Sequence, residues 1–96
     1  MVMDEQVRTA ILELLPQLRE LGVTSLSVFG SASRSQLRPD SDVDVLVELG
    51  IDNQETYFAV LFMLEDKLER KVDLVLRDTL HPRIRDRVVS EAVRVA

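Results

Sequence analysis

Several features are missing from this sequence, and each absence narrows the possible functions. There is no cysteine, which excludes disulfide bonds and thiolate metal sites and argues against redox chemistry. There is no run of about 18 or more apolar residues of the kind that spans a bilayer. The N-terminus, Met1–Glu5, lacks the basic and then apolar pattern of a signal peptide. We therefore expect a cytoplasmic protein that does not associate with membranes.

The chain also lacks an excess of positive charge. Twelve lysine and arginine residues stand against 17 aspartate and glutamate residues, which gives a net charge of −5. A general nucleic-acid binder would present a basic face, so we expect no direct binding to nucleic acid. A nucleotide ligand is still compatible with this charge, because metal ions held by carboxylates can neutralise a triphosphate locally.

The length of 96 residues leaves room for one hydrophobic core and no second nucleotide-binding lobe. No repeat, low-complexity tract or linker divides the chain. We therefore expect residues 1–96 to form one domain.

Helical and extended patterns alternate along the chain. Apolar residues at steps of three and four predict helices over 4–21, with a kink or a new segment at Pro16, and over 53–69. A third apolar stripe predicts a last helix through Leu80, Ile84, Val88, Ala92 and Val95. Strands are predicted at 25–29, 43–49 and 71–76. This order predicts an α/β (α+β) fold in which helices pack on a mixed three-stranded sheet.

The helix over 53–69 is expected to be the main core helix. Its predicted inner face holds Tyr57, Leu61, Leu64 and Leu68, and Phe58 and Phe62 are expected to widen that face.

Two carboxylates, Asp42 and Asp44, open the second predicted strand. Successive side chains of a strand alternate between its faces, so both carboxylates point the same way, while Val43, Val45 and Val47 face the core. Two adjacent carboxylates repel each other unless a cation lies between them. Oxygen ligands without cysteine or clustered histidine suit magnesium or manganese.

Asp73 is a third candidate ligand, because it interrupts the apolar strand over 71–76, where an unpaired charge is costly to bury. If that strand neighbours the strand of Asp42, three carboxylates can meet around two metal ions. One ion would activate an attacking hydroxyl, and the other would hold a triphosphate and stabilise its leaving pyrophosphate.

Gly30 and Ser31 follow the first predicted strand and suit a phosphate-binding turn. Glycine removes side-chain bulk, and free amides at the start of a helical turn bind anions. Arg34, one turn further on, could donate to phosphate oxygens. Taken singly, each of these short motifs also fits a solvated turn or strand edge, and Asp73 could simply pair with Lys71 or Arg70. Their ordered combination is far more specific.

In this combination the sequence resembles the nucleotidyltransferases of the DNA polymerase β superfamily, and more narrowly the minimal nucleotidyltransferases of the antitoxin type. The family pattern is approximately Gly-Ser-x-Ala-Arg-Gly, five variable residues, then Ser-Asp-x-Asp. The corresponding residues here are Gly30, Ser31, Ser33, Arg34, Ser35, Ser41, Asp42 and Asp44, with Asp73 downstream. Ser35 replaces a glycine; if that position needs a positive φ, serine costs on the order of 1 kcal/mol.

The resemblance implies a magnesium-dependent protein adenylyltransferase that uses ATP. By that resemblance Asp42, Asp44 and Asp73 would hold two Mg²⁺ ions, and the nucleotide would be bound at Gly30 and Ser31, with Arg34 and Ser41 beside them. The family is encoded beside a HEPN-class ribonuclease toxin, to which the antitoxin would transfer AMP at a tyrosine within a hetero-oligomer.

Two other hypotheses remain open. The domain could be a non-catalytic antitoxin that neutralises its toxin by direct binding. It could also modify a small molecule such as an aminoglycoside, although such enzymes usually add a second domain.

Overall fold

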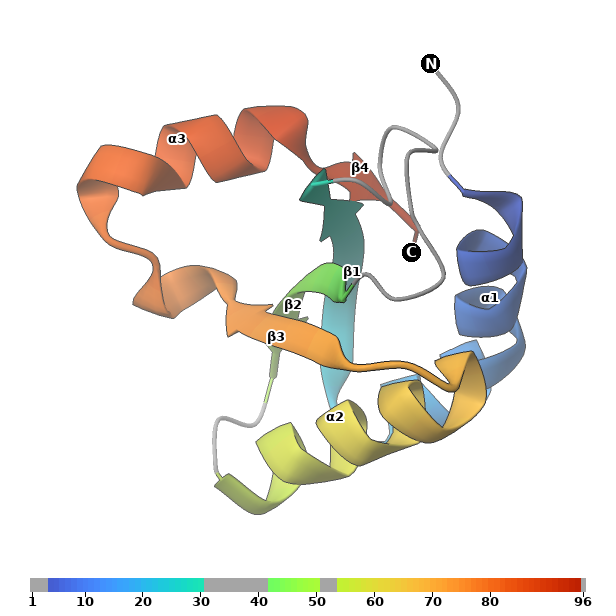
Figure 1. Ribbon diagram of the computed structural model, residues 1–96. Helices are drawn as coiled ribbons and strands as arrows, with labels where there is room; N and C mark the ends of the chain where they lie inside the picture. The colour runs from blue at the N-terminus through green and yellow to red at the C-terminus, as the bar shows by residue number, and fades with distance from the viewer. Residues whose placement is uncertain (1–3, 31–41, 51–53, 96) are drawn as a thin grey trace.

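The computed structural model (Figure 1) describes residues 4–30, 42–50 and 54–95 of the chain. Its elements, in chain order, are α1 (Glu5–Glu20), β1 (Val23–Phe29), β2 (Val43–Leu49), α2 (Gln54–Leu68), β3 (Val72–Leu76), the 3₁₀ turn η2 (Arg77–Thr79), α3 (Pro82–Glu91) and β4 (Val93–Arg94). None of the helices in these ranges is long and apolar enough to cross a membrane.

The strands form one mixed sheet in the order β3-β2-β1-β4. β2 runs parallel to β3 and antiparallel to β1, and β4 is antiparallel to β1. The predicted α+β class, the mixed sheet and the three predicted strands are confirmed. Within the described ranges the sheet has four strands, however, so the predicted number of three is wrong.

The fourth strand replaces the end of the predicted last helix. α3 ends at Glu91, and Val93 and Arg94 pair with Val28 and Ser27 of β1. The backbone N–H of Val95 then donates to the carbonyl of Leu26 at 2.9 Å. β1 would otherwise have unpaired backbone groups along this edge, and pairing with β4 satisfies them.

One face of the sheet forms the core with α1 and α2, which both lie on the same side of it in Figure 1. The strands contribute every second residue to this core face, as the alternation of a half-covered sheet requires. These residues are Leu26 and Val28 of β1, Val43, Val45 and Val47 of β2, and Val72 and Leu74 of β3. The helices add Val7, Ile11 and Leu18 from α1, and Val60 and Leu64 from α2.

α1 runs as one helix through Pro16, so no new segment begins there. The Asp4 side chain caps its start by accepting from the N–H of Val7 at 3.0 Å. Gly22 follows its end with a φ of 105°, a conformation that glycine adopts without steric cost.

α2 is the second core helix, but two aromatic residues assigned to its inner face lie outside. Phe58 is 45% exposed and Phe62 is 61% exposed, and their rings stack on each other with centroids 5.9 Å apart. Val60 and Leu64 are the fully buried residues instead. The predicted widening of the inner face is therefore wrong.

α3 lies on the other side of the sheet from α1 and α2 (Figure 1) and has no buried residue. Its start is capped by His81, whose Nδ1 accepts from the N–H of Arg83 at 3.1 Å. Of the predicted stripe, Leu80 before the helix is buried, whereas Ile84 is 49% exposed. The predicted last helix is therefore present, but it does not contribute to the core, which lies on the opposite face of the sheet.

Candidate active site

The face of the sheet opposite to α1 and α2, which we call the open face, carries the predicted carboxylates. Asp44 of β2 and Asp73 of β3 stand directly opposite each other in the parallel register. Both alternate with core residues, Val43 and Val45 around Asp44, and Val72 and Leu74 around Asp73. The condition stated for the carboxylates to meet, that the strand of Asp73 neighbours the strand of Asp42 and Asp44, is fulfilled.

The pKa of Asp44 is raised above its ordinary value of 3.8. Partial burial is the largest cause, because it removes water from the charged form. The negative charges of Asp73 and then Asp42 add to it, as does a hydrogen bond between the carboxyl groups of Asp44 and Asp73. A cation placed among the three groups would offset the repulsion between their negative charges.

Asp42 lies two residues before Asp44 and is exposed, just ahead of the start of β2. Between them, the N–H of Val43 donates to the carbonyl of Lys71 at 3.0 Å. This bond joins the beginnings of β2 and β3, so the segments that carry Asp42, Asp44 and Asp73 start at the same end of the sheet.

Gly30 completes this end of the sheet from β1. Phe29, the last residue of β1, pairs with Asp44, and Gly30 follows with a φ of 67°. A Cβ at position 30 would overlap Oδ2 of Asp44. The sequence suggested that this glycine makes room for a phosphate; the structure shows that it also makes room for the Asp44 carboxylate.

Two side chains of α2 hold β3 in place, in roles that the sequence did not predict. The Glu65 carboxylate accepts from the N–H of Val72 at 3.1 Å, and the Tyr57 hydroxyl donates to the carbonyl of Leu74 at 2.7 Å. These bonds flank Asp73 on both sides. No local pattern predicts them, because they depend on how α2 crosses the edge of the sheet.

The donor set fits a magnesium or manganese site in its chemistry, since all three candidate ligands are carboxylates. Over 4–30, 42–50 and 54–95, no group of three or more His, Asp or Glu side chains is arranged to hold a metal ion as it stands. The remaining predicted nucleotide-binding residues, Ser31, Arg34 and Ser41, lie outside the described residues, as does Ser35.

Comparison with known proteins agrees with this geometry. A family model described as a nucleotidyltransferase domain matches residues 7–95. Protein adenylyltransferase MntA of Thermococcus cleftensis is 34% identical over 93 residues, which are 95% of this chain and 94% of that protein.

Solved structures share the fold. A structure provisionally described as a minimal nucleotidyltransferase has a TM-score of 0.84 and 31% identity, over 97% of this chain and 96% of that one. An MNT antitoxin complexed with a tri-AMPylated Shewanella oneidensis HEPN toxin has a TM-score of 0.71 at 20% identity, over 98% of this chain and 72% of that one. The chain therefore belongs to the nucleotidyltransferase-domain family, as a minimal member similar to protein adenylyltransferase MntA.

Proposed function

We propose that this protein is an antitoxin that transfers AMP from ATP to the hydroxyl group of a tyrosine in a HEPN ribonuclease toxin. This modification neutralises the toxin. The observation that carries the proposal is the pairing of Asp44 with Asp73 on the open face, with Asp42 and Gly30 at the same end. The name of the Thermococcus relative and the AMPylated toxin in the Shewanella complex support the same reaction.

Asp42, Asp44 and Asp73 are the residues that would hold two Mg²⁺ ions. When bound, these ions supply neutralisation of the triphosphate charge and a lower pKa for the acceptor hydroxyl. Asp44 must be ionised to act as a ligand, so its raised pKa makes metal affinity depend on pH. Asp73 is on the edge strand β3 and exposed, which leaves it accessible to an acceptor hydroxyl arriving from solvent.

The nucleotide would be held at the end of β1. Gly30 has no side chain that would keep phosphate oxygens away, and Ser31, Arg34 and Ser41 are proposed to add a hydroxyl, a guanidinium fork and a second hydroxyl. The acceptor toxin and this protein would form a hetero-oligomer in the cytoplasm, without direct contact to nucleic acid.

The reaction is tested by incubating the partner toxin with the protein, ATP and Mg²⁺, and weighing the toxin by mass spectrometry. We expect a mass gain of one or more AMP units that is lost with EDTA and with the double variant Asp42→Asn, Asp44→Asn. The exposed Asp66 on α2 provides the control, since Asp66→Asn makes the same chemical change away from the site. An undiminished mass gain in the double variant contradicts the proposal.

A non-catalytic antitoxin is the competing function, and the exposed aromatic pair of α2 favours it. Phe58 and Phe62 offer stacked rings to a partner, and exposed aromatics are common in protein interfaces. The same experiment separates the two functions. A double variant that no longer transfers AMP yet still suppresses the toxin's ribonuclease activity would show that binding suffices.

A further inference from the structure

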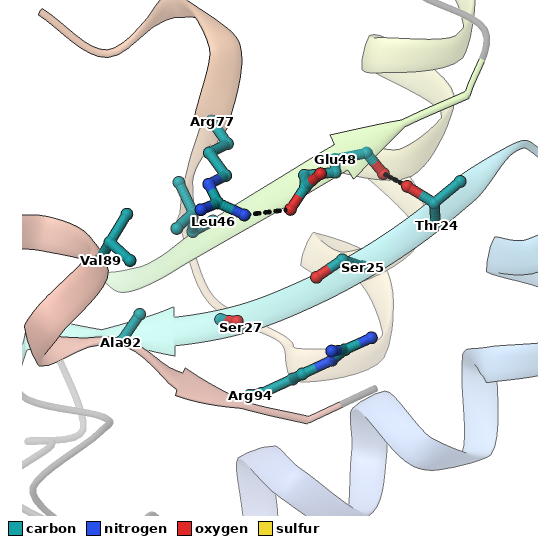
Figure 2. A pocket seen from close by; sticks show the side chains of 9 residues that line it. All are labelled: Thr24, Ser25, Ser27, Leu46, Glu48, Arg77, Val89, Ala92 and Arg94. Carbon is teal, nitrogen blue, oxygen red and sulfur yellow. Dashed lines mark hydrogen bonds and ion pairs between the residues drawn. The ribbon is translucent and has the colours of Figure 1, made fainter. Parts of the chain in front are cut away.

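A pocket of about 440 Å³ lies on the open face, between β1, β2, β4 and the end of α3 (Figure 2). Ser27 and Leu46 line it from the sheet, and Val89 and Ala92 close it from the α3 side. Two arginines, Arg77 and Arg94, stand on its rim, and Nη1 of Arg77 pairs with Oε1 of Glu48 at 2.7 Å.

The pocket continues the candidate active site along the same face. Leu46 and Glu48 follow Asp44 on β2 at steps of two residues, so all three point to the open face. Two residues of a strand span about 6–7 Å. A segment of chain that fills the pocket can therefore reach the carboxylates within two or three residues of its own length.

The C-terminal part of the chain, which supplies both arginines of the pocket, has a net charge opposite to that of the rest of the chain. Residues 77–96 contain five arginines and three carboxylates, whereas residues 1–76 contain seven basic and fourteen acidic residues. The arginines of this part include Arg77 and Arg94 on the pocket rim and Arg83, Arg85 and Arg87 on α3. A ligand that suits the pocket rim is therefore acidic.

The exposure of α3 points to a large ligand. This helix has no buried residue, and Ile84 leaves half of its surface in solvent. A nucleoside would fill the pocket but would leave α3 uncovered, and its neutral base would not use the arginines. A protein segment laid over the pocket covers both.

The other charges on the open face distinguish protein from nucleic acid. Glu48 lies in the pocket, and Asp44 and Asp73 lie beyond it on the same face. The phosphates of RNA follow one another without interruption and would meet these carboxylates, as well as the −5 net charge of the chain. A peptide can place its acidic residues on the arginines alone.

We propose that the pocket between the open face and α3 binds an acidic segment of the acceptor protein, next to the hydroxyl that receives AMP. This inference rests on the proposed function in assuming a protein acceptor, but binding to the pocket requires neither ATP nor catalysis. Arg94 and Arg77 pair with acidic residues of the segment, Leu46 and Val89 contact its apolar atoms, and the pocket orients it toward Asp73.

The test is a titration of the ¹⁵N-labelled protein without ATP, followed by NMR. The probe is a blocked peptide of sequence Glu-Glu-Tyr-Glu-Glu, with Lys-Lys-Tyr-Lys-Lys as the peptide of opposite charge. We expect the acidic peptide alone to shift the amide signals of Ser27, Leu46 and Ala92. Arg94→Glu should weaken its binding about tenfold, whereas Arg8→Glu, the same change on the exposed side of α1, should leave it unchanged.

A second variant protects the test against misfolding, because Arg94 is part of β4. Val89 lies on α3, outside the sheet, and Val89→Glu places a carboxylate on the wall of the pocket. This variant should weaken binding of the acidic peptide to a similar extent. Asp44→Asn should bind the peptide as the wild type does, so loss of AMP transfer and loss of peptide binding are separate results.

Three outcomes overturn the inference. The first is an equal response to the two peptides, and the second is a set of shifts that lies outside the pocket. The third is a pocket that responds to adenosine or to a short oligoadenylate RNA but not to the acidic peptide.

Discussion

The two faces of the sheet differ in what covers them and in what they carry. The core face is sealed by α1 and α2, and its strand residues, such as Leu26 and Val45, have no exposed surface. The open face is only partly covered by α3, and it carries Asp44, Asp73 and the pocket. The same strands form both faces, because neighbouring residues of a strand point to opposite sides of the sheet.

Neighbouring residues of one strand therefore have different roles, since one stabilises the fold and the next belongs to the candidate active site. Burial of aliphatic side chains on the core face supplies the folding free energy, because apolar surface is removed from water. On the open face, Asp44 and Asp73 are held close although their charges repel, which reduces stability. The core face therefore compensates for a functional arrangement that would not be favourable alone.

The largest expected effect comes from a matched pair on β1. Leu26→Ala removes a fully buried side chain and should lower the free energy of unfolding by about 3 kcal/mol. Ser27→Ala, the next residue on the open face, should change it by less than about 0.5 kcal/mol. Urea denaturation followed by circular dichroism measures both. Similar losses for the two variants would mean that the faces do not differ as described.

The second prediction concerns Gly30, where the two faces meet at the end of β1. Gly30→Ala introduces a Cβ that overlaps the Asp44 carboxylate, at a φ of 67°. The carboxylate must move, so the rate of AMP transfer should fall about 10- to 100-fold, with a stability loss of about 1–2 kcal/mol from the left-handed backbone.

Gly50→Ala is the control for this variant. A Cβ there meets Thr24 Cγ2 at 3.4 Å, an ordinary contact, and the rate of AMP transfer should stay within about twofold of the wild type. A Gly30→Ala variant that matched this control in rate would refute the role assigned to Gly30.

The smallest effect is a gain in stability. Asp44 has a raised pKa in the folded protein, so its ionisation above that pKa destabilises the native state relative to the unfolded one. Asp44→Asn removes this repulsion. In EDTA at pH 7, its Tm should exceed that of the wild type by about 2–4 °C, a modest gain because Asp44 is only half-buried and water screens its charge.

The pH dependence of this gain has a definite sign. As pH falls, wild-type Asp44 becomes protonated, and the difference in Tm should vanish below the ordinary aspartate pKa of 3.8. Scanning calorimetry at several pH values measures it. Added Mg²⁺ should raise the Tm of the wild type more than that of the variant; equal Tm values in EDTA at pH 7 would contradict the prediction.

The sequence predicted those parts of the molecule that depend on alternation within a strand. The valines at 43, 45 and 47 are buried as expected, and Asp44 therefore points to the other face. The partnership of Asp44 with Asp73 could only be stated conditionally, because strand order depends on the crossover by α2 and not on a local pattern. In the structure this crossover connects two neighbouring parallel strands, β2 and β3.

Patterns along helices were less reliable predictors here. α2 has apolar residues around most of its circumference, so periodicity could not choose Val60 over Phe62 for the core. The apolar spacing of three and four residues after Leu80 continues to Val95, past the end of α3 at Glu91, although Val93 and Arg94 form β4. β4 forms because β1 has a free edge, and that edge lies 65 residues away along the chain.

The parallel register of β2 and β3 links the accuracy of folding to the assembly of the site. If β3 slipped by one residue, Asp73 would turn toward α2, and Val72 and Leu74 would face solvent. Such a misaligned strand would leave a buried charge and lose apolar burial at once. Packing of the core therefore selects the register of β3, and the register that folds stably is also the one that aligns Asp73 with Asp44.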